Sequence, residues 1–318
     1  MNRAIALNQE LVLLCAEQAQ LREGQFSSKL QRYFARAEHS RRPRTGRTAQ
    51  LQEYFRTNSG DWPIAAILRQ HQTNDCKRRY WLRADPVHIS PDLSTARLLA
   101  CEQFGLSESE AEHFFQTLQP IVEQAGYLLS RSDSNTWYIS APQQLTATLF
   151  AEPSQAMGDN IMNHLPSGEG AAAWIRLMNE TQIVLHADPI NRQRRAQAKL
   201  PINSLWFWGA GYYPSRIHTA LLRIISNADD LSAFASATNT PLIERFSTEQ
   251  LRAGTLIDLR SIISKGQLGQ EFIIPAISEL DRGLFKRLRI DFMDGAQFCI
   301  TASQAWYFWR NRRTSFNL

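Results

Sequence analysis

Apolar and polar positions along the chain predict interleaved helices and strands. A capping box at 107–110 opens a helix that is expected to run to about Ala125. A second strong helical stretch covers 168–195 and is interrupted near Pro189. Short apolar runs typical of buried strands follow, at 205–208, 221–225 and 255–259. This alternation favours a layered α/β fold, with helices around a mixed sheet.

The first 60 residues follow a different pattern. A stripe of apolar residues recurs there at helical spacing: Ala4, Leu7, Leu11 and Leu14. A basic run at 40–48 comes next, and a short helical stretch follows near 49–56. We therefore expect residues 1–60 to form a helical, basic and partly flexible segment, and residues 61–318 to form the α/β domain.

The excess positive charge lies in this first segment. The chain carries 35 Lys and Arg against 30 Asp and Glu, a net charge of +5. Residues 1–70 hold 11 Lys and Arg against 6 Asp and Glu, whereas the remaining 248 residues hold 24 of each. The run at 40–48 predicts either a solvated, mobile loop or an arm that contacts an anionic partner. No helix-turn-helix, RNA-binding or zinc-finger pattern accompanies it, so we do not expect nucleic acid as the partner.

The composition excludes several classes of protein. Hydrophobic residues make up 43% of the chain, enough to build a sizeable core and too many for a disordered protein. The 4 cysteines lie far apart and form no CxxC motif, which is typical of reduced thiols in a cytoplasmic protein. No apolar run is long enough to span a bilayer, and no signal peptide is recognisable.

A first group of polar residues lies at the end of a predicted strand. Arg83, Asp85 and His88 follow the start of that strand, and Pro86 is expected to turn it into a loop. An arginine can grip an anion with two hydrogen bonds, and a neighbouring Asp and His can move protons. The alternative is that Asp85 caps the turn and pairs with Arg83.

Two more groups could join the first in one ligand-binding crevice. A polar stripe on the helix expected at 171–186 consists of Asn179, Gln182 and His186. Three further side chains flank the approach to the apolar strand at 205–208, namely Asn191, Arg194 and Asn203. The alternatives are a solvent-facing helix side and a structural polar network.

Gly209 and Gly211 follow the same apolar strand. Glycines at such a place let backbone N–H groups approach an anion, although the string is too short for the dinucleotide-binding fingerprint GxGxxG. The chain also lacks GxxxxGK[ST], GxSxG and HExxH. Carboxylates and histidines are scattered, without the dense Asp/His sets of two-metal sites, so we expect neither a metal nor a cofactor.

Several strings together resemble one bacterial family. They are Trp81–His88, Asn179–Gln182, Leu185-His186, Asn191–Arg194 and Pro201–Gly211. The family is the regulator-of-pathogenicity-factors type E family, whose members are often labelled cofactor-independent phosphoglycerate mutase or mutase-like. The resemblance covers roughly 60–312. The stretch 191–211 is also similar to archaeal-type phosphoglycerate mutases of the alkaline-phosphatase superfamily, and this similarity implies α/β/α layers.

The mutase resemblance implies a Ser or Thr nucleophile between two divalent metal ions. In that pattern an acidic metal motif stands at the N-terminus and an Asp/His motif near the C-terminus. Residues 1–20 contain no Asp, no histidine follows His218, and Trp208 stands where the enzymes have an arginine before Gly-Ala-Gly. The sequence therefore predicts a degenerate, mutase-like core without the metal site.

Three functions follow as hypotheses. The first is a cytoplasmic, mutase-like pseudoenzyme with a regulatory role, whose anion-binding pocket takes a small phosphorylated or carboxylated metabolite. The second is an active cofactor-independent phosphoglycerate mutase. The third is an interaction protein whose basic N-terminal arm binds a partner protein or nucleic acid, although nucleic acid is the less expected of the two.

Overall fold

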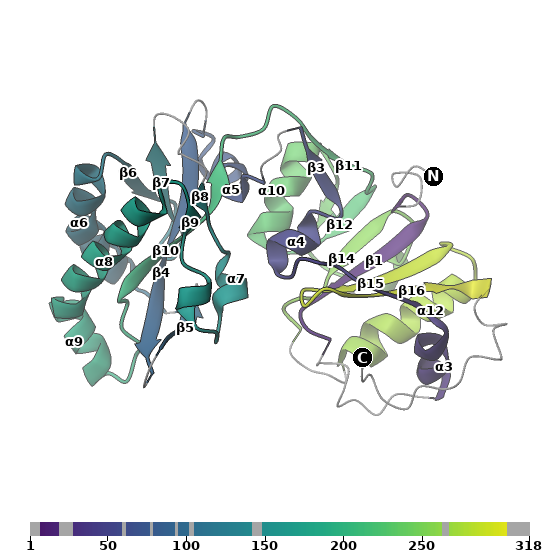
Figure 1. Ribbon diagram of the computed structural model, residues 1–318. Helices are drawn as coiled ribbons and strands as arrows, with labels where there is room; N and C mark the ends of the chain where they lie inside the picture. Colours follow the sequence, from purple (N-terminus) through teal and green to yellow (C-terminus); the bar gives the residue numbers. More distant parts are fainter. Residues whose placement is uncertain are drawn as a thin grey trace. The chain divides into compact units, whose positions relative to one another are not determined.

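The computed structural model describes residues 7–18, 28–58, 62–76, 79–92, 95–101, 105–141, 148–262 and 267–303. The chain forms two compact units (Figure 1). The discontinuous unit joins Met1–Arg56 to Ile217–Leu318, and the inserted unit is Thr57–Arg216. This division differs from the expected boundary near residue 60, because the first 56 residues belong to the same unit as the C-terminal part of the chain.

The discontinuous unit is built on a seven-stranded sheet with the order β13-β12-β14-β1-β15-β16-β2. The strands in this order are Leu242–Ile243, Arg223–Ile225, Thr255–Asp258, Glu10–Cys15, Arg287–Phe292, Ala296–Thr301 and Glu38–Arg41. The first five strands are parallel to one another, and β16 is antiparallel to both β15 and β2. The helices are α3 (Ser28–Arg36), α4 (Arg47–Leu51), α10 (Asp229–Thr238) and α12 (Ile274–Asp281), with a π-helical turn, η3, at Leu268–Ile273 and a 3₁₀ turn, η2, at Thr248–Gln250. The mixed sheet and its helices confirm the expected α/β class.

The helix expected from Leu11 and Leu14 is wrong. These residues belong to β1, which lies between the parallel strands β14 and β15. Every residue from Leu11 to Cys15 is 0% exposed. A strand buried on both faces is apolar at successive positions, so a short apolar run of this kind also contains pairs at helical spacing.

The basic run at 40–48 is part of the fold of the discontinuous unit. Residues 38–41 form strand β2 at the edge of the sheet, and α4 begins at Arg47. The backbone N–H of Arg42 donates to the carbonyl oxygen of Gly295 at 2.8 Å, and that of Gly46 donates to Met293 at 2.8 Å. Arg42 is itself only 6% exposed. The structure thus corrects the expectation of a solvated loop, because paired backbone groups and a buried guanidinium tie this segment to the sheet.

The inserted unit is built on a five-stranded antiparallel sheet with the order β10-β4-β7-β6, in which β5 pairs with β4. These strands are Ser204–Gly211, Tyr80–Pro91, Trp137–Ala141, Leu128–Arg131 and Ala96–Cys101. Its helices are α5 (Ile64–Thr73), α6 (Glu108–Gln124), α7 (Pro153–Ala156), α8 (Ala171–Ala187) and α9 (Pro189–Ala196), with a 3₁₀ turn, η1, at Ile161–Asn163. In Figure 1, α6, α8 and α9 lie together along one side of the sheet. A small ribbon of β8 (Thr148–Leu149) and β9 (Ser167–Gly168) completes the strands of this unit. A second small ribbon pairs β3 (Phe55–Thr57), at the boundary of the two units, with β11 (Ile217–Thr219) of the discontinuous unit.

Local sequence signals account for several of these elements. The capping box is confirmed, since Ser107 Oγ accepts from the backbone N–H of Glu110 and Glu110 Oε2 accepts from that of Ser107. Asp294-Gly295 is a favoured hairpin turn and predicts a hairpin of 288–292 with 298–301. The pair β15–β16 confirms this hairpin, and Gly295 has φ 94°. The break between α8 and α9 falls at Asp188, whose carboxylate accepts from the N–H of Ile190.

Pro86 does not end its strand. β4 runs without a break through Pro86, which lies opposite Leu205 of β10. On the other side, β4 pairs with β7 up to Arg83 and with β5 from Val87 onward. Pro86 therefore falls in the gap between two partner strands, where a residue without an N–H is tolerated.

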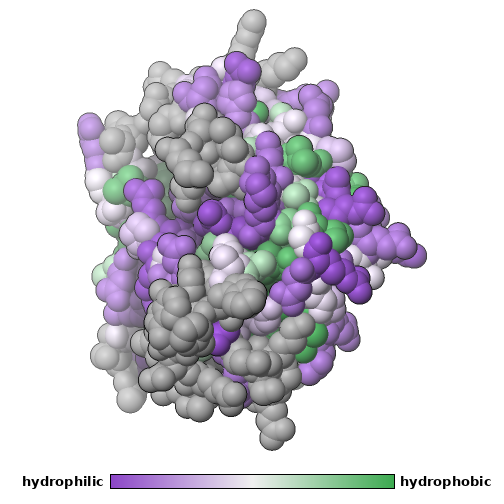
Figure 2. Space-filling model, turned by 90° about the vertical axis from the view of Figure 1, so that its right-hand side faces the viewer, coloured by the Kyte–Doolittle hydropathy of each residue, from purple (hydrophilic) through white to green (hydrophobic). Residues whose placement is uncertain are grey.

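Two further sequence expectations concern the ends and surface of the molecule. The sequence also predicts a last helix at 303–312, but only Ser303 of this range is among the described residues. Within the described ranges, no helix combines the length and the apolar character needed to cross a membrane. On the face shown in Figure 2, hydrophilic residues predominate and apolar residues occupy a smaller area.

Candidate functional site

The first predicted group forms a buried cluster in the inserted unit. Arg83 donates from Nε and Nη2 to Asp85 Oδ1, at 2.8 and 2.5 Å. Trp208 Nε1 donates to Asp85 Oδ2 at 2.5 Å. The guanidinium also lies over the rings of Tyr138 and Trp208, 5.4 and 5.7 Å from their centroids. Burial raises the pKa of the Tyr138 phenol, even though the charge of Arg83 acts against it. This cluster joins β4, β7 and β10, which is a structural role.

The third predicted group anchors the segment between α9 and β10. Asn191 Nδ2 donates to the carbonyls of Leu185 and Ile202 at 2.7 and 2.5 Å, and its Oδ1 accepts from Ile202 at 2.8 Å. Arg194 donates to Leu200 and to Glu110, at 2.9 and 3.0 Å. Each side chain is at most 1% exposed. They bind backbone and a neighbouring helix, and so they fix the approach to β10.

Asn203 and His88 connect this segment to the first group. Asn203 exchanges two hydrogen bonds with the backbone of Ile89, at 2.8 and 2.7 Å. His88 Nδ1 donates to the carbonyl oxygen of Pro201 at 2.9 Å. Burial lowers the pKa of His88, and its hydrogen bond to Pro201 opposes that shift. The side chains of Asn203 and His88 thus bring these two groups together through hydrogen bonds to backbone atoms.

The polar stripe on α8 faces away from these contacts. Asn179 and His186 are exposed and Gln182 is half-buried, whereas the buried side of the helix carries Trp174 and Leu177. Among the described residues, no hydrogen bond or ion pair links the stripe to the other two groups. This matches the solvent-facing alternative for the helix. A ligand-binding role for any of the three groups stays a prediction.

Gly209 and Gly211 allow α5 to approach β10 closely. A Cβ at Gly209, which has φ +70°, would meet the side chain of Ile64 and would lie 3.2 Å from the backbone N of Ala65. A Cβ at Gly211, with φ +151°, would lie 2.5 Å from Cβ of Pro63. Tight packing therefore explains both glycines without an anion.

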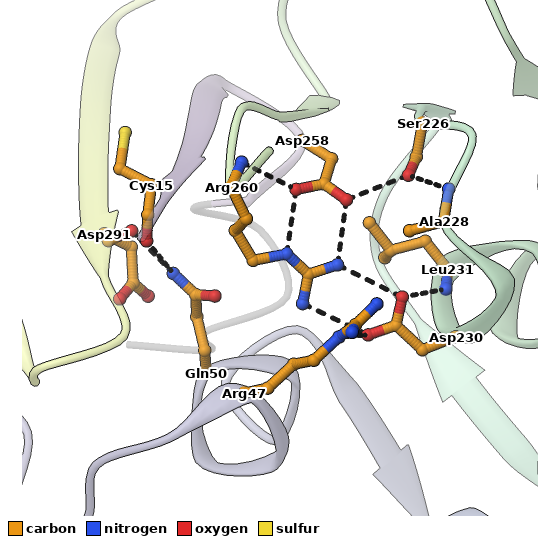
Figure 3. A network of polar contacts seen from close by, with 10 residues as sticks. All are labelled: Cys15, Arg47, Gln50, Ser226, Ala228, Asp230, Leu231, Asp258, Arg260 and Asp291. Carbon is orange, nitrogen blue, oxygen red and sulfur yellow. Dashed lines mark hydrogen bonds and ion pairs between the residues drawn. The ribbon is translucent and has the colours of Figure 1, made fainter. Parts of the chain in front are cut away.

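A second polar cluster, which the sequence did not predict, lies in the discontinuous unit. It gathers at the carboxyl ends of the parallel strands β12, β14, β1 and β15 (Figure 3). Open α/β sheets bind their ligands at this edge. Its members come from these strand ends, from α4 and the residues flanking it, and from α10. We refer to them as the carboxyl-edge cluster: Cys15, Arg42, Arg47, Gln50, Tyr54, Ser226, Asp230, Asp258, Arg260 and Asp291.

One half of the carboxyl-edge cluster is centred on Arg260. Its Nε and Nη2 donate to the two carboxylate oxygens of Asp258, each at 2.8 Å. Its Nη1 and Nη2 donate to the two oxygens of Asp230, each at 3.1 Å. Arg47 Nε adds a contact of 2.6 Å to Asp230 Oδ2, and Ser226 Oγ donates to Asp258 at 2.9 Å. Burial alone would raise the pKa of Asp230, but the charges of Arg260 and Arg47 outweigh it and hold that pKa below its usual range.

The other half is centred on Asp291. Its carboxylate accepts from Arg42 Nη1 and from the Tyr54 hydroxyl, each at 2.6 Å, and from Gln297 Nε2 at 3.0 Å. Gln50 donates both amide hydrogens to strand-end carbonyls, at 2.6 Å to Asp291 and 3.2 Å to Cys15. Burial raises the pKa of Asp291 in spite of the charge on Arg42. Burial, followed by the charge of Asp291, also raises the pKa of Cys15 well above its ordinary value, so this residue is a neutral thiol and a poor nucleophile.

The carboxyl-edge cluster does not fit a pair of divalent metal ions. Guanidinium, hydroxyl and amide donors already bind the oxygens of Asp230, Asp258 and Asp291. No group of three or more His, Cys, Asp or Glu in the part of the chain that the structure describes could hold a metal ion. A metal ion would have to displace an arginine from a buried carboxylate, at a cost of several kcal/mol.

Sequence relatives of the chain carry the name of a mutase. A stretch of 62 residues is 47% identical to a probable 2,3-bisphosphoglycerate-independent phosphoglycerate mutase of Geobacter sulfurreducens, and it covers 20% of this chain and 16% of that protein. A stretch of 147 residues is 30% identical to the 2,3-bisphosphoglycerate-independent phosphoglycerate mutase of Methanosarcina mazei, covering 45% of this chain and 36% of that protein. The matches thus span little more than a third of these curated relatives, or less. No protein-family model matches the chain.

Two solved structures are also similar over most of the chain. One is a cofactor-independent phosphoglycerate mutase from Thermoplasma acidophilum, with a TM-score of 0.39 and 10% identity over 92% of this chain and 89% of that one. The other is the PH0037 protein from Pyrococcus horikoshii, with a TM-score of 0.40 and 10% identity over 93% and 88%. At these TM-scores the overall likeness is weak. The names of the sequence relatives agree with the mutase part of the expected resemblance, whereas membership of the regulator family stays a prediction.

Proposed function

We propose that this chain is a phosphoglycerate-mutase-like protein that binds a small phosphorylated or carboxylated acid in the cytoplasm and acts in regulation rather than in metal-dependent catalysis. The observation that carries the proposal is the charge balance of the carboxyl-edge cluster. Arg42 binds Asp291, and Arg260 binds both Asp258 and Asp230. The positive charge that metal ions would supply beside these carboxylates is supplied by arginine side chains.

Buried carboxylates and fixed guanidiniums favour ligand binding over phosphoryl transfer. Metal-dependent phosphoryl transfer needs metal ions to position a nucleophile and to stabilise the leaving oxygen. In this cluster Asp230, Asp258 and Arg260 are each 7% exposed at the side chain, and Cys15 is a buried neutral thiol. The arginine side chains of the cluster can bind an oxyanion. The cluster offers neither unpaired carboxylates for metal ions nor a reactive Cys15 thiolate to drive phosphoryl transfer.

The alternative is an active cofactor-independent phosphoglycerate mutase. The names of the sequence relatives favour it, and so does the position of Asp258 and Asp291 at strand ends. It requires metal ions to enter a site whose carboxylates already have arginine partners. The third hypothesis, a free basic arm, loses support because Arg42 and Arg47 are held in ion pairs.

A paired assay tests the proposal. The full chain is incubated with Mn²⁺ and assayed for interconversion of 2- and 3-phosphoglycerate. The same preparation is screened by thermal shift against phosphoglycerates, other phosphorylated acids and simple carboxylic acids. We expect no metal-dependent turnover and a rise in melting temperature with at least one acid, because a ligand that binds only the folded state stabilises it. Metal-dependent turnover would favour the enzyme instead.

A further inference from the structure

Asp230 lies where the anion of a ligand is expected to bind. It belongs to the first turn of α10, which follows β12, and Arg260 lies two positions after β14. Arg47 reaches the same carboxylate from the start of α4. Three separate segments thus bring two guanidiniums to one carboxylate at the carboxyl edge of the parallel sheet (Figure 3). Ligands of open α/β sheets bind at this edge.

The contacts of the Asp230 carboxylate are those of a bound oxyanion. Oδ2 accepts from Arg47 Nε at 2.6 Å and from Arg260 Nη1 at 3.1 Å. Oδ1 accepts from Arg260 Nη2 at 3.1 Å and from the backbone N–H of Leu231 at 2.7 Å. Two arginines and a backbone N–H are a common set of donors for a carboxylate or phosphate group.

The ion pairs of Asp230 lie close to solvent on the side of Arg47. The Arg47 side chain is 35% exposed, whereas those of Asp230 and Arg260 are each 7% exposed. Asp229, the preceding residue of α10, is exposed. If the Asp230 side chain moved away, Arg47 and Arg260 would each lose this carboxylate as a partner, and an incoming anion could replace it.

An unsatisfied acceptor in the same cluster also indicates a ligand. Both amide hydrogens of Gln50 serve strand-end carbonyls, which fixes the direction of its amide oxygen. This oxygen is buried, and no described residue donates to it. Figure 3 shows it pointing away from Cys15 and Asp291, on the side where Arg47 and Arg260 lie. A buried acceptor without a donor is unfavourable, and a ligand hydroxyl or a bridging water would supply the missing hydrogen bond.

We propose that Arg47 and Arg260 form the binding site for the phosphate or carboxylate group of a small acid, and that Asp230 occupies this site in the absence of the acid. The inference rests on the proposed function and names the site at which that acid binds. An acid that enters would replace the two oxygens of Asp230 at the guanidiniums and release the N–H of Leu231. Because the internal carboxylate competes with the ligand, the apparent affinity is lower than that of the open site.

Neutralising Asp230 should therefore open the site. The test compares Asp230→Asn with Asp229→Asn, which makes the same charge change at the exposed neighbour. Inorganic phosphate and 3-phosphoglycerate are titrated calorimetrically into each full-length protein at constant ionic strength. We expect Asp230→Asn to bind at least one of the two about tenfold or more tightly than the unmodified chain, and Asp229→Asn to leave the affinity unchanged. Adding Arg47→Gln to Asp230→Asn should remove the gain.

Three results would overturn the inference. They are an unchanged affinity in Asp230→Asn, an equal gain in Asp229→Asn, and a gain that persists with Arg47→Gln.

If Asp230→Asn does not fold, hydrogen exchange of the unmodified chain decides the question. Saturating phosphate or 3-phosphoglycerate should then speed exchange of the Leu231 amide, and an unchanged or slower rate contradicts displacement of Asp230. The unmodified chain could bind an acid with an affinity that neither Asp230→Asn nor the added Arg47→Gln changes. This result would refute the site and leave the proposed function standing. Metal-dependent turnover would refute the proposed function itself.

Discussion

Each unit of the molecule contains a buried arginine–aspartate cluster, and the two differ in what surrounds them. In the inserted unit, Arg83 and Asp85 stand two positions apart on one strand, and the carboxylate also accepts from an indole. In the discontinuous unit, Arg260 binds carboxylates from two different elements at the carboxyl edge of a parallel sheet. The first cluster ties neighbouring strands together. The second lies where a ligand or a metal ion would bind, so position in the fold separates two clusters of similar composition.

The largest effect is expected from Arg260→Ala. This substitution leaves the buried carboxylates of Asp258 and Asp230 without their main partner, and we expect a loss of about 3–5 kcal/mol in the free energy of unfolding. Urea denaturation of the full chain measures it. Arg282→Ala is the matched control, because the Arg282 side chain is 71% exposed and its ion pair with Glu279 should contribute less than about 0.5 kcal/mol. A loss below about 1 kcal/mol for Arg260→Ala would mean that the two carboxylates do not depend on it.

The cluster of the inserted unit should be nearly as sensitive. Asp85→Ala removes the carboxylate that pairs Arg83 and accepts from Trp208, and we expect a loss of about 2–4 kcal/mol. His186→Ala, on the exposed side of α8, should change stability by less than about 0.5 kcal/mol. The same denaturation experiment measures both. If Asp85→Ala is tolerated but weakens the binding of an acid, the first predicted group is a ligand site after all.

Packing of α5 on β10 should be sensitive to a substitution at Gly209. Gly209→Ala puts a Cβ against Ile64 at a residue with φ +70°, and we expect a loss of about 1–3 kcal/mol. Gly126→Ala separates backbone strain from the clash, because Gly126 has φ +87° and nothing lies within 4 Å of its Cβ position. It should cost about 1 kcal/mol. Equal losses at the two sites would remove the packing explanation for the Gly-Ala-Gly string.

The smallest effect concerns the pH dependence of stability. The pKa of Asp230 is lower in the folded chain than its ordinary value of about 3.9. Its contribution is therefore present above the ordinary pKa and is lost as the pH falls through the folded pKa. Asp291, whose pKa is raised, changes stability in the opposite direction.

Asp230→Asn should accordingly flatten the decline of stability below about pH 5. Denaturation midpoints between pH 3 and 7 measure this slope. Asp229→Asn, at the exposed neighbour, is the control. An unchanged slope in Asp230→Asn would show that this carboxylate gains little from its two arginines.

Much of the fold was predictable because its signals are local. The capping box at Ser107, the Asp294-Gly295 turn and the helical pattern of 171–186 each depend on residues close in sequence. β1 was not predictable in this way. Its apolar run fits both a helix and a strand buried on both faces, and only pairing with β14 and β15 decides between them.

The candidate site was harder to predict for a related reason. The recognisable strings around Arg83, Asn191 and Asn203 turn out to bind backbone and neighbouring side chains, a role that residue type alone does not distinguish from ligand binding. The members of the carboxyl-edge cluster lie as far apart in sequence as Cys15 and Asp291 and are brought together by the order of the strands. One signal was present, since Asp258 and Asp291 each follow an apolar strand segment.

The central claim is that arginines, and not metal ions, balance the carboxylates at the carboxyl edge of the parallel sheet. Elemental analysis tests it most directly. The purified full-length chain is incubated with an excess of Mn²⁺, Mg²⁺ and Zn²⁺, freed of loosely bound ions by gel filtration, and measured for metal per mole of protein. The account predicts no stoichiometric metal. Two equivalents of tightly bound metal, lost together on chelation and accompanied by mutase turnover, would contradict it.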